Sequence, residues 1–115
     1  MSWLRELGNW LRDVFHTNRP LAVACVEDVP DVVKSGVVYL IGDGPAPWAA
    51  SFLCPCGCGE TISLSLIPTD RPSWRAQVLR NGLITLSPSV WRTKGCRSHF
   101  FIRSGRVVWA KTVRH

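Results

Sequence analysis

Apolar side chains near the start of the chain recur at spacings of three and four residues, the period of an α-helix with one apolar face. They are Trp3, Leu4, Leu7, Trp10, Leu11, Val14 and Phe15. Ser2 can cap such a helix, and Pro20 blocks its continuation. We predict an amphipathic helix over residues 1–19 that covers one face of a sheet, with insertion into a membrane interface or a partner's groove as the alternative.

Beyond Pro20 the pattern changes to short runs with β-branched residues, each bounded by Gly, Pro, Asp or Asn. The clearest run alternates Ile62, Leu64 and Leu66 with polar residues, as a half-buried strand does. The predicted strands lie at residues 37–41, 49–53, 61–66, 75–80, 83–87, 100–103 and 107–111. The stretch 26–35 could hold a second short helix. The predicted fold class is therefore β-rich α+β, with the N-terminal helix packed on a small antiparallel sheet.

Composition and charge indicate a globular domain but exclude few classes of binding partner. With 46% hydrophobic and 19% charged residues, the 115-residue chain has globular composition. We expect one domain over residues 1–115, made of the helix at 1–19 and a β core at 36–111. The formal net charge of +6 is spread along the chain. It fits an ordinary solvated surface, or acidic partners such as nucleic acid, an anionic membrane surface or an acidic protein face.

The sequence shows neither a membrane span nor a secretory signal. No apolar run approaches the roughly 18 residues that a transmembrane helix needs. Glu6 and Asp13 interrupt the N-terminal apolar pattern, unlike the apolar region of a signal peptide. We therefore expect no transmembrane segment and a location in the cytoplasm, where clustered cysteines more often bind metal than form disulfides.

Three of the five cysteines are clustered between two predicted strands. Cys54, Cys56 and Cys58 alternate with Pro and Gly, and the glycines let the backbone fold tightly around an ion, as in a zinc knuckle. Cys96 and His99 come later, at a spacing that lets both side chains reach one ion, and they directly precede another strand. We therefore predict a zinc ion bound to the β core, which makes the sheet zinc-ribbon-like.

Tetrahedral zinc takes four ligands, whereas this cluster offers five candidates. We favour a site made of Cys54, one of Cys56 and Cys58, Cys96 and His99. The alternative is an all-cysteine site of Cys54, Cys56, Cys58 and Cys96, in which three ligands so close in sequence would crowd the ion. Reduced thiols packed without metal are the other interpretation. A catalytic zinc with Glu60 as base is less favoured, since thiolate-rich sites are more often structural and Glu60 could simply be a surface residue. Cys25, in an apolar run, is predicted to be a buried core residue.

A second group of residues suggests nucleophilic catalysis. Ser87 and Ser89 precede His99, and a serine placed against an imidazole is the minimum for this chemistry. The possible orienting groups are Asp43, Glu60 and Asp70. Alternatively, the serines are turn residues bonded to local backbone. Because one imidazole cannot be both a zinc ligand and a free base through the same nitrogen, the catalytic interpretation requires the all-cysteine metal site.

Several motifs together resemble a family of small bacterial proteins that carries an unknown-function label. The motifs are Cys-Pro-Cys-Gly-Cys-Gly-Glu at 54–60, Ile62-x-Leu64-x-Leu66, Trp74, Leu86-x-Pro88-Ser89-Val90, Cys96-x-x-His99-Phe100-x-Ile102 and Gly105-x-Val107-x-Trp109. The resemblance covers residues 36–110. Members of this family are often encoded beside ubiquitin-like proteins, their activating and conjugating enzymes, and a metallopeptidase.

The resemblance implies a role in bacterial ubiquitin-like conjugation, with the ubiquitin-like protein and its activating or conjugating enzymes as partners. The matched Ser89 and His99 favour a serine-type peptidase that processes the ubiquitin-like precursor or its conjugates. One alternative is a noncatalytic, ligase-like adaptor. Another is a basic zinc ribbon that binds nucleic acid and stacks bases on exposed tryptophans. The tryptophans that could stack are Trp48, Trp74, Trp91 and Trp109.

Overall fold

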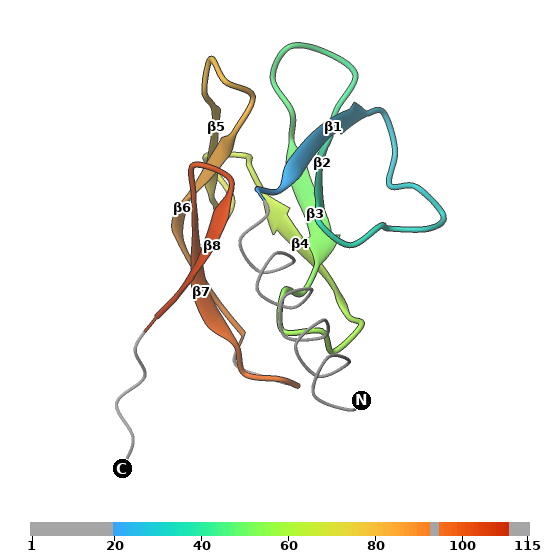
Figure 1. Cartoon of the computed structure of the whole chain (residues 1–115). Helices are drawn as coiled ribbons and strands as arrows, with labels where there is room; N and C mark the ends of the chain where they lie inside the picture. The colour runs from blue at the N-terminus through green and yellow to red at the C-terminus, as the bar shows by residue number, and fades with distance from the viewer. Residues whose placement is uncertain (1–19, 93–94, 111–115) are drawn as a thin grey trace, which may run out of the picture.

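Two four-stranded β-sheets make up the part of the chain that the computed structural model describes, residues 20–92 and 95–110 (Figure 1). The first sheet contains, in spatial order, β1 (Ala22–Val26), β2 (Val37–Ile41), β3 (Ala49–Leu53) and β4 (Thr61–Ser65). The second contains β5 (Arg75–Val78), β6 (Ile84–Trp91), β7 (His99–Arg103) and β8 (Arg106–Trp109). β1 runs parallel to β2, and every other neighbouring pair is antiparallel.

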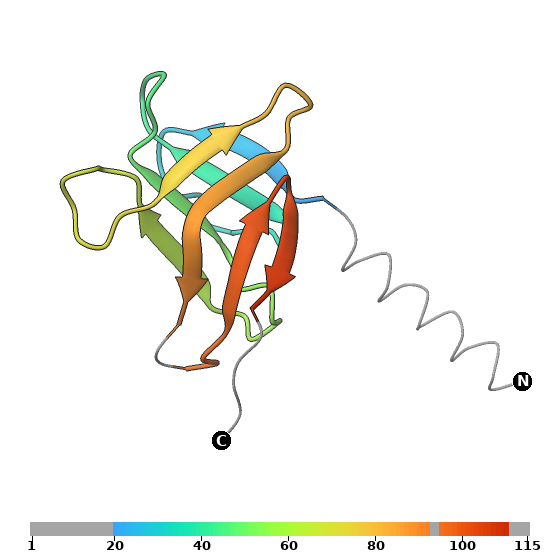
Figure 2. The same cartoon turned by 90° about the vertical axis from the view of Figure 1, so that its left-hand side faces the viewer.

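The two sheets pack face to face around one apolar core. In β4, Ile62 and Leu64 are buried while the polar residues that alternate with them point outward, as the sequence pattern predicts. The ring of Phe52 in β3 meets the ring of Phe100 in β7 edge to face, with centroids 6.2 Å apart. Burying each such side chain stabilises the fold by about 1.5–3 kcal/mol. These contacts hold the second sheet, which is seen from its outer side in Figure 2, against the first.

The predicted α+β class is wrong. The described residues contain no helix, and two sheets forming a sandwich, with one parallel strand pair, replace the single antiparallel zinc-ribbon-like sheet. Each sheet has one apolar face that must be covered, and here the other sheet covers it, the role that we had expected a helix to fill. The helix expected at 1–19 lies outside the described residues. Among residues 20–92 and 95–110, no helix is long and apolar enough to cross a membrane.

β1 is a strand that the sequence pattern did not predict, because its small, uniformly apolar residues show no alternation. It forms the edge of the first sheet, where Cys25 stands opposite Leu40 of β2. Cys25 is exposed at this edge, so the prediction that it is a core residue is wrong. The stretch 26–35, considered as a short helix, contains bends and turns instead.

β6 is longer than predicted and carries an irregularity. The sequence placed its end at Ser87, before a proline, but the strand continues to Trp91. Leu86 pairs with Ile102 and Val90 pairs with Phe100, so the register of the two strands shifts between these pairs. Proline has no N–H to donate to the ladder, and a bulge is where a strand inside a sheet can tolerate it. The bulge at residues 87–89 displays the serine that follows the proline.

Candidate functional site

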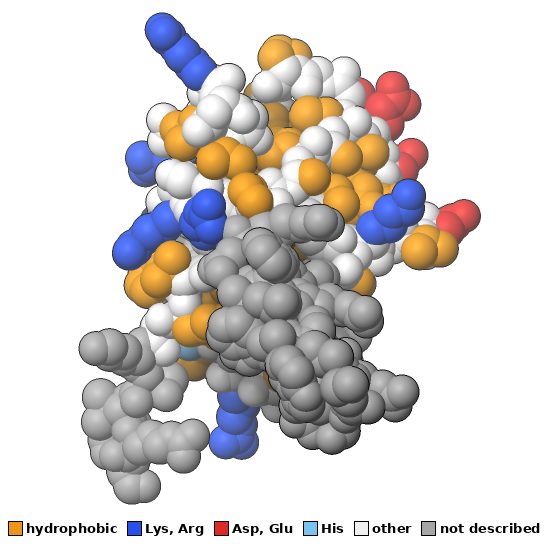
Figure 3. Space-filling model, in the orientation of Figure 1, with side chains coloured by type: hydrophobic (Ala, Val, Ile, Leu, Met, Phe, Trp, Pro, Cys, Tyr) orange, Lys and Arg blue, Asp and Glu red, His pale blue; other side chains and the backbone are white. Residues whose placement is uncertain are grey.

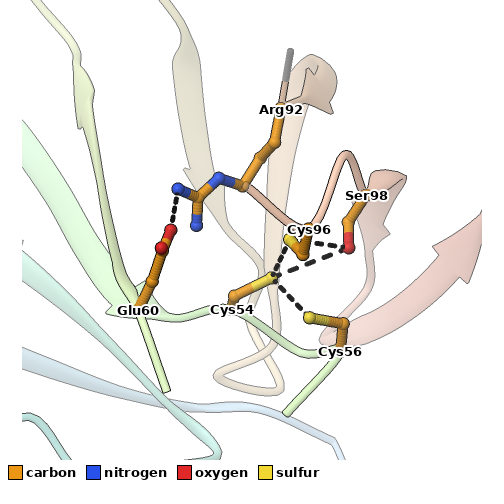
Figure 4. A network of polar contacts seen from close by, with 6 residues as sticks. All are labelled: Cys54, Cys56, Glu60, Arg92, Cys96 and Ser98. Atoms are coloured by element: carbon orange, nitrogen blue, oxygen red, sulfur yellow. Dashed lines mark hydrogen bonds and ion pairs between the residues drawn. The ribbon is translucent and has the colours of Figure 1, made fainter. Parts of the chain in front are cut away.

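Four cysteine thiols gather where the β3–β4 and β6–β7 connections meet. Figure 4 shows Cys54, Cys56 and Cys96 of this group. The Sγ atoms of Cys54, Cys56, Cys58 and Cys96 all lie within 4.8 Å of one another. The Sγ of Cys54 is 3.3 Å from that of Cys56 and 3.6 Å from that of Cys96. Because the first three cysteines follow a strand of the first sheet and the fourth follows a strand of the second, the cluster joins the two sheets.

The backbone around the first three cysteines is folded back tightly. Gly57 and Gly59 have φ angles of +88° and +85°, which glycine adopts without the steric cost that a side chain brings. The N–H of Cys54 donates to the carbonyl of Glu60 at 2.9 Å and so closes this turn. Alternating cysteine and glycine therefore place three thiols on one side of a short turn.

The geometry and chemistry of the four thiols fit a metal ion. All five cysteines of the chain are free, so no disulfide competes for these sulfurs. A tetrahedral ion with metal–sulfur bonds of about 2.3 Å holds its sulfurs about 3.8 Å apart, close to the separations from Cys54. The Ser98 hydroxyl, 3.1 Å from the Sγ of Cys96, helps to lower the pKa of that thiol to about 6, whereas burial raises the pKa of Cys54 to about 12. The four residues could hold a metal ion.

A cation stands beside the thiols. The guanidinium of Arg92 forms an ion pair with the carboxylate of Glu60, and Figure 4 shows this pair next to the cysteines. The Nη1 atom of Arg92 is buried and has no hydrogen-bond partner in the described part of the chain. A positive charge at this place favours the thiolate form of a neighbouring cysteine, which is the form that binds metal. Glu60, considered in the sequence as a catalytic base, is therefore engaged by Arg92.

Ser89 and His99 form a second constellation, on the outer face of the second sheet. The Nε2 atom of His99 lies 2.9 Å from the Oγ of Ser89. Ser89 stands on the β6 bulge, where its carbonyl accepts a hydrogen bond of 3.3 Å from the indole Nε1–H of Trp74. The ring of His99, the first residue of β7, stacks on the ring of Trp91 with centroids 5.0 Å apart and planes 13° apart. Backbone and side-chain contacts thus fix both partners.

The five predicted metal ligands lie at two separate sites in the structure. The four cysteines form one group, whereas His99 lies outside it and pairs with Ser89, which is the arrangement of the all-cysteine alternative. Of the orienting groups considered, Glu60 is engaged by Arg92, and Asp70 accepts a 2.5 Å hydrogen bond from the hydroxyl of a nearby serine. Whether metal is bound, and whether Ser89 and His99 react, stay predictions.

Sequence reasoning missed the residues that support these groups. Trp91 lies two residues after Ser89 in the same strand, so the period of two along a strand could have placed both on one face. Ser98, the neighbour of His99, is an unspecified position of the Cys96-x-x-His99 motif, yet it is buried against the thiols. Nothing in the sequence indicates that the indole of Trp74 reaches Ser89, because that contact depends on how β5 lies beside β6.

Comparison with protein families shows which family the described strands and the site belong to. The model of a family described as "Bacterial ubiquitination-like system serine protease (BubE)" matches residues 25–110. This range includes the four clustered cysteines and both members of the serine–histidine pair. It confirms the resemblance to proteins of bacterial ubiquitin-like systems that the motifs suggest. No curated protein and no solved structure matches the chain.

Proposed function

Because the chain belongs to the family of serine proteases of bacterial ubiquitination-like systems, we propose that it is a serine-type peptidase with Ser89 as nucleophile and His99 as general base. The observation that carries this proposal is the 2.9 Å separation between Ser89 Oγ and His99 Nε2. It falls within the roughly 2.6–3.2 Å that direct proton transfer between nucleophile and base requires.

The proposed reaction follows from that geometry. With the ring proton on Nδ1, His99 Nε2 accepts the hydroxyl proton of Ser89 as Oγ attacks the carbonyl carbon of the scissile peptide bond. The imidazolium then donates this proton to the leaving amine, which leaves an ester between Ser89 and the acyl part of the substrate. Water, deprotonated by the same imidazole, hydrolyses the ester and regenerates the serine. Stacking on Trp91 keeps the imidazole in position throughout.

We further propose that the four-cysteine group holds zinc in a structural role. Four thiolates complete a tetrahedral shell and leave no position for a water molecule, so bound zinc would supply rigidity rather than a reactive hydroxide. Cys96 stands three residues before His99, and Ser98 between them contacts the thiols of both Cys54 and Cys96. Fixing Cys96 therefore fixes the start of β7, where the proposed base lies.

The proposed substrate is a ubiquitin-like precursor or a conjugate of it, cleaved at the peptide bond that follows the ubiquitin-like part. Two observations support it: the family description names a bacterial ubiquitination-like system, and Ser89 and His99 are only half-buried on the outer face of the second sheet. A reducing cytoplasm suits a protein that keeps its metal-binding cysteines as thiols.

The test uses three variants and the purified precursor. Ser89→Ala and His99→Ala should each lower the rate of precursor cleavage by at least about a thousandfold, since removal of a nucleophile or its base has effects of this size. Both variants should retain bound zinc and the melting temperature of the wild-type protein. Ser35→Ala, a change at an exposed serine in the β1–β2 connection, is the matched control and should cleave normally.

Cleavage within about threefold of the wild-type rate in Ser89→Ala would exclude this serine as the nucleophile. Loss of zinc together with loss of cleavage in His99→Ala would instead show that the histidine acts through the metal site, contrary to the proposal.

A further inference from the structure

A pocket of about 480 Å³ opens beside Ser89 on the outer face of the second sheet. Its walls include Thr85, Ser87 and Ser89 from β6, and Phe101 and Arg103 from β7. Successive outward positions of β7 are thus His99, Phe101 and Arg103, because side chains two residues apart in a strand share a face. The proposed nucleophile and the guanidinium of Arg103 therefore belong to the same hollow.

Arg103 is held over an aromatic ring. Its guanidinium carbon lies 4.2 Å from the centroid of the Phe101 ring, which is the geometry of a cation–π contact. A cation–π contact uses the charge of the guanidinium and not its hydrogen-bond donors, so the N–H groups can still donate to an acceptor. Phe101 also lies next to His99, with ring centroids 6.0 Å apart. The cation is in this way linked to the proposed base through one intervening ring.

Among the described residues that line it, the pocket has a positive charge and hydroxyl donors but no carboxylate. Its charge comes from Arg103, and the ion pair of Glu60 with Arg92 lies outside this pocket. The Thr85 hydroxyl accepts a 2.9 Å hydrogen bond from the N–H of Ser104, so its own proton can be donated to an anion. On the face shown in Figure 3, most Lys and Arg side chains lie on the side of the second sheet and the acidic ones on the side of the first.

We propose that this pocket binds a carboxylate of the substrate, close to the bond that Ser89 attacks, and that Arg103 is the residue that selects it. The inference rests on the proposed peptidase function and adds a preference to it. Two groups of a polypeptide have this chemistry: the side chain of Asp or Glu, and the carboxyl terminus. Either would form charge-assisted hydrogen bonds with the guanidinium and with a hydroxyl of the β6 wall.

Binding to Ser89→Ala protein tests the inference without any cleavage. The probes are fluorescent pentapeptides of Ala and Gly, measured by fluorescence anisotropy. In the first pair, the central residue is Glu in one peptide and Gln in the other, and both carboxyl ends are amidated. In the second pair, neither peptide contains Glu or Gln, and the carboxyl end is free in one and amidated in the other. We expect at least one carboxylate probe to bind about threefold to tenfold more tightly than its neutral counterpart, the range for a charge-assisted contact discounted for solvent.

Arg103 should be responsible for that preference. Adding Arg103→Gln to the Ser89→Ala background should abolish it, and Arg103→Glu should reverse it in favour of a Lys-containing probe. Arg80→Gln, at an exposed arginine outside the pocket, removes the same charge from this basic chain and should leave the preference intact.

Equal affinity for charged and neutral probes would overturn the inference, and so would an equal loss in Arg80→Gln and Arg103→Gln. These binding results do not depend on catalysis. Cleavage of the precursor by the wild-type protein tests the peptidase function separately, so failure of one proposal can be told from failure of the other. The pair of probes that responds identifies the acidic side chain or the chain terminus as the source of the carboxylate.

Discussion

If the four-cysteine group holds zinc as proposed, removing the ion should destabilise the fold by loosening the contact between its two sheets at one end. The group ties Cys54, at the end of β3, to Cys96, in the β6–β7 connection. Without the ion, the link between these segments consists of weak contacts between thiols and the Ser98 hydroxyl, together with the ion pair of Arg92 with Glu60. Thiolates that approach one another without a cation also repel.

The magnitude follows from the length of chain that the metal closes. Cys54 and Cys96 are 42 residues apart. A cross-link over a loop of that length restricts the unfolded chain by about 4 kcal/mol at 25 °C in the chain-entropy treatment used for disulfides. For a chain of this size, a loss of about 4 kcal/mol lowers the melting temperature by roughly 12–20 °C. Binding of zinc to the unfolded cysteines would reduce this figure.

The assay is thermal unfolding of the zinc-loaded protein with and without a chelator, with the metal content measured in both samples. Cys96→Ser should reproduce the effect of the chelator, whereas Cys25→Ser, at the exposed cysteine of β1, should not change the melting temperature. A chelated sample that has lost its zinc yet melts within about 2 °C of the loaded one would refute the reasoning.

Four further substitutions, at three residues, test the supports of the proposed site and the core behind it. Trp91→Ala, which removes the ring stacked on His99, should lower kcat about threefold to tenfold with KM little changed, and Trp91→Phe should restore most of it. Trp74→Phe, which removes the hydrogen bond to the Ser89 carbonyl, should destabilise the fold by about 1 kcal/mol in a denaturant titration. Phe100→Ala, at a fully buried ring between the sheets, should destabilise it by about 3–5 kcal/mol in the same titration.

Strands with clear alternation could be predicted from the sequence, and their assembly could not. The pattern around Ile62 and Leu64 marks a half-buried strand wherever that strand pairs. Alternation of apolar and polar residues indicates which face of a strand is apolar, but it does not indicate what packs on that face. The sequence therefore predicts one sheet covered by a helix, whereas the structure has two sheets that cover each other. β1 was not predicted because Ala22–Val26 is a partly buried edge strand whose residues are all apolar, so apolar and polar positions do not alternate along it.

The candidate site likewise has one part that could be predicted from the sequence and one that could not. Cysteines that alternate with glycines predict a turn with converging thiols, since that feature is local to residues 54–59. The separation of His99 from those thiols depends on the β6 bulge, which turns Ser89 toward β7. Spacing along the chain could not show this, because the i, i+3 relation of Cys96 and His99 is compatible with a shared ion or with opposite faces of a strand end.

The most direct test of the central claim is the intact mass of the protein after exposure to a fluorophosphonate, a reagent that phosphonylates serines activated by a neighbouring base. We predict one adduct, located by peptide mapping at Ser89, which is absent in Ser89→Ala and formed at least about a hundredfold more slowly in His99→Ala. An unmodified mass for folded, zinc-loaded protein, or an adduct on another residue, would contradict the claim that this serine and histidine are the reacting pair.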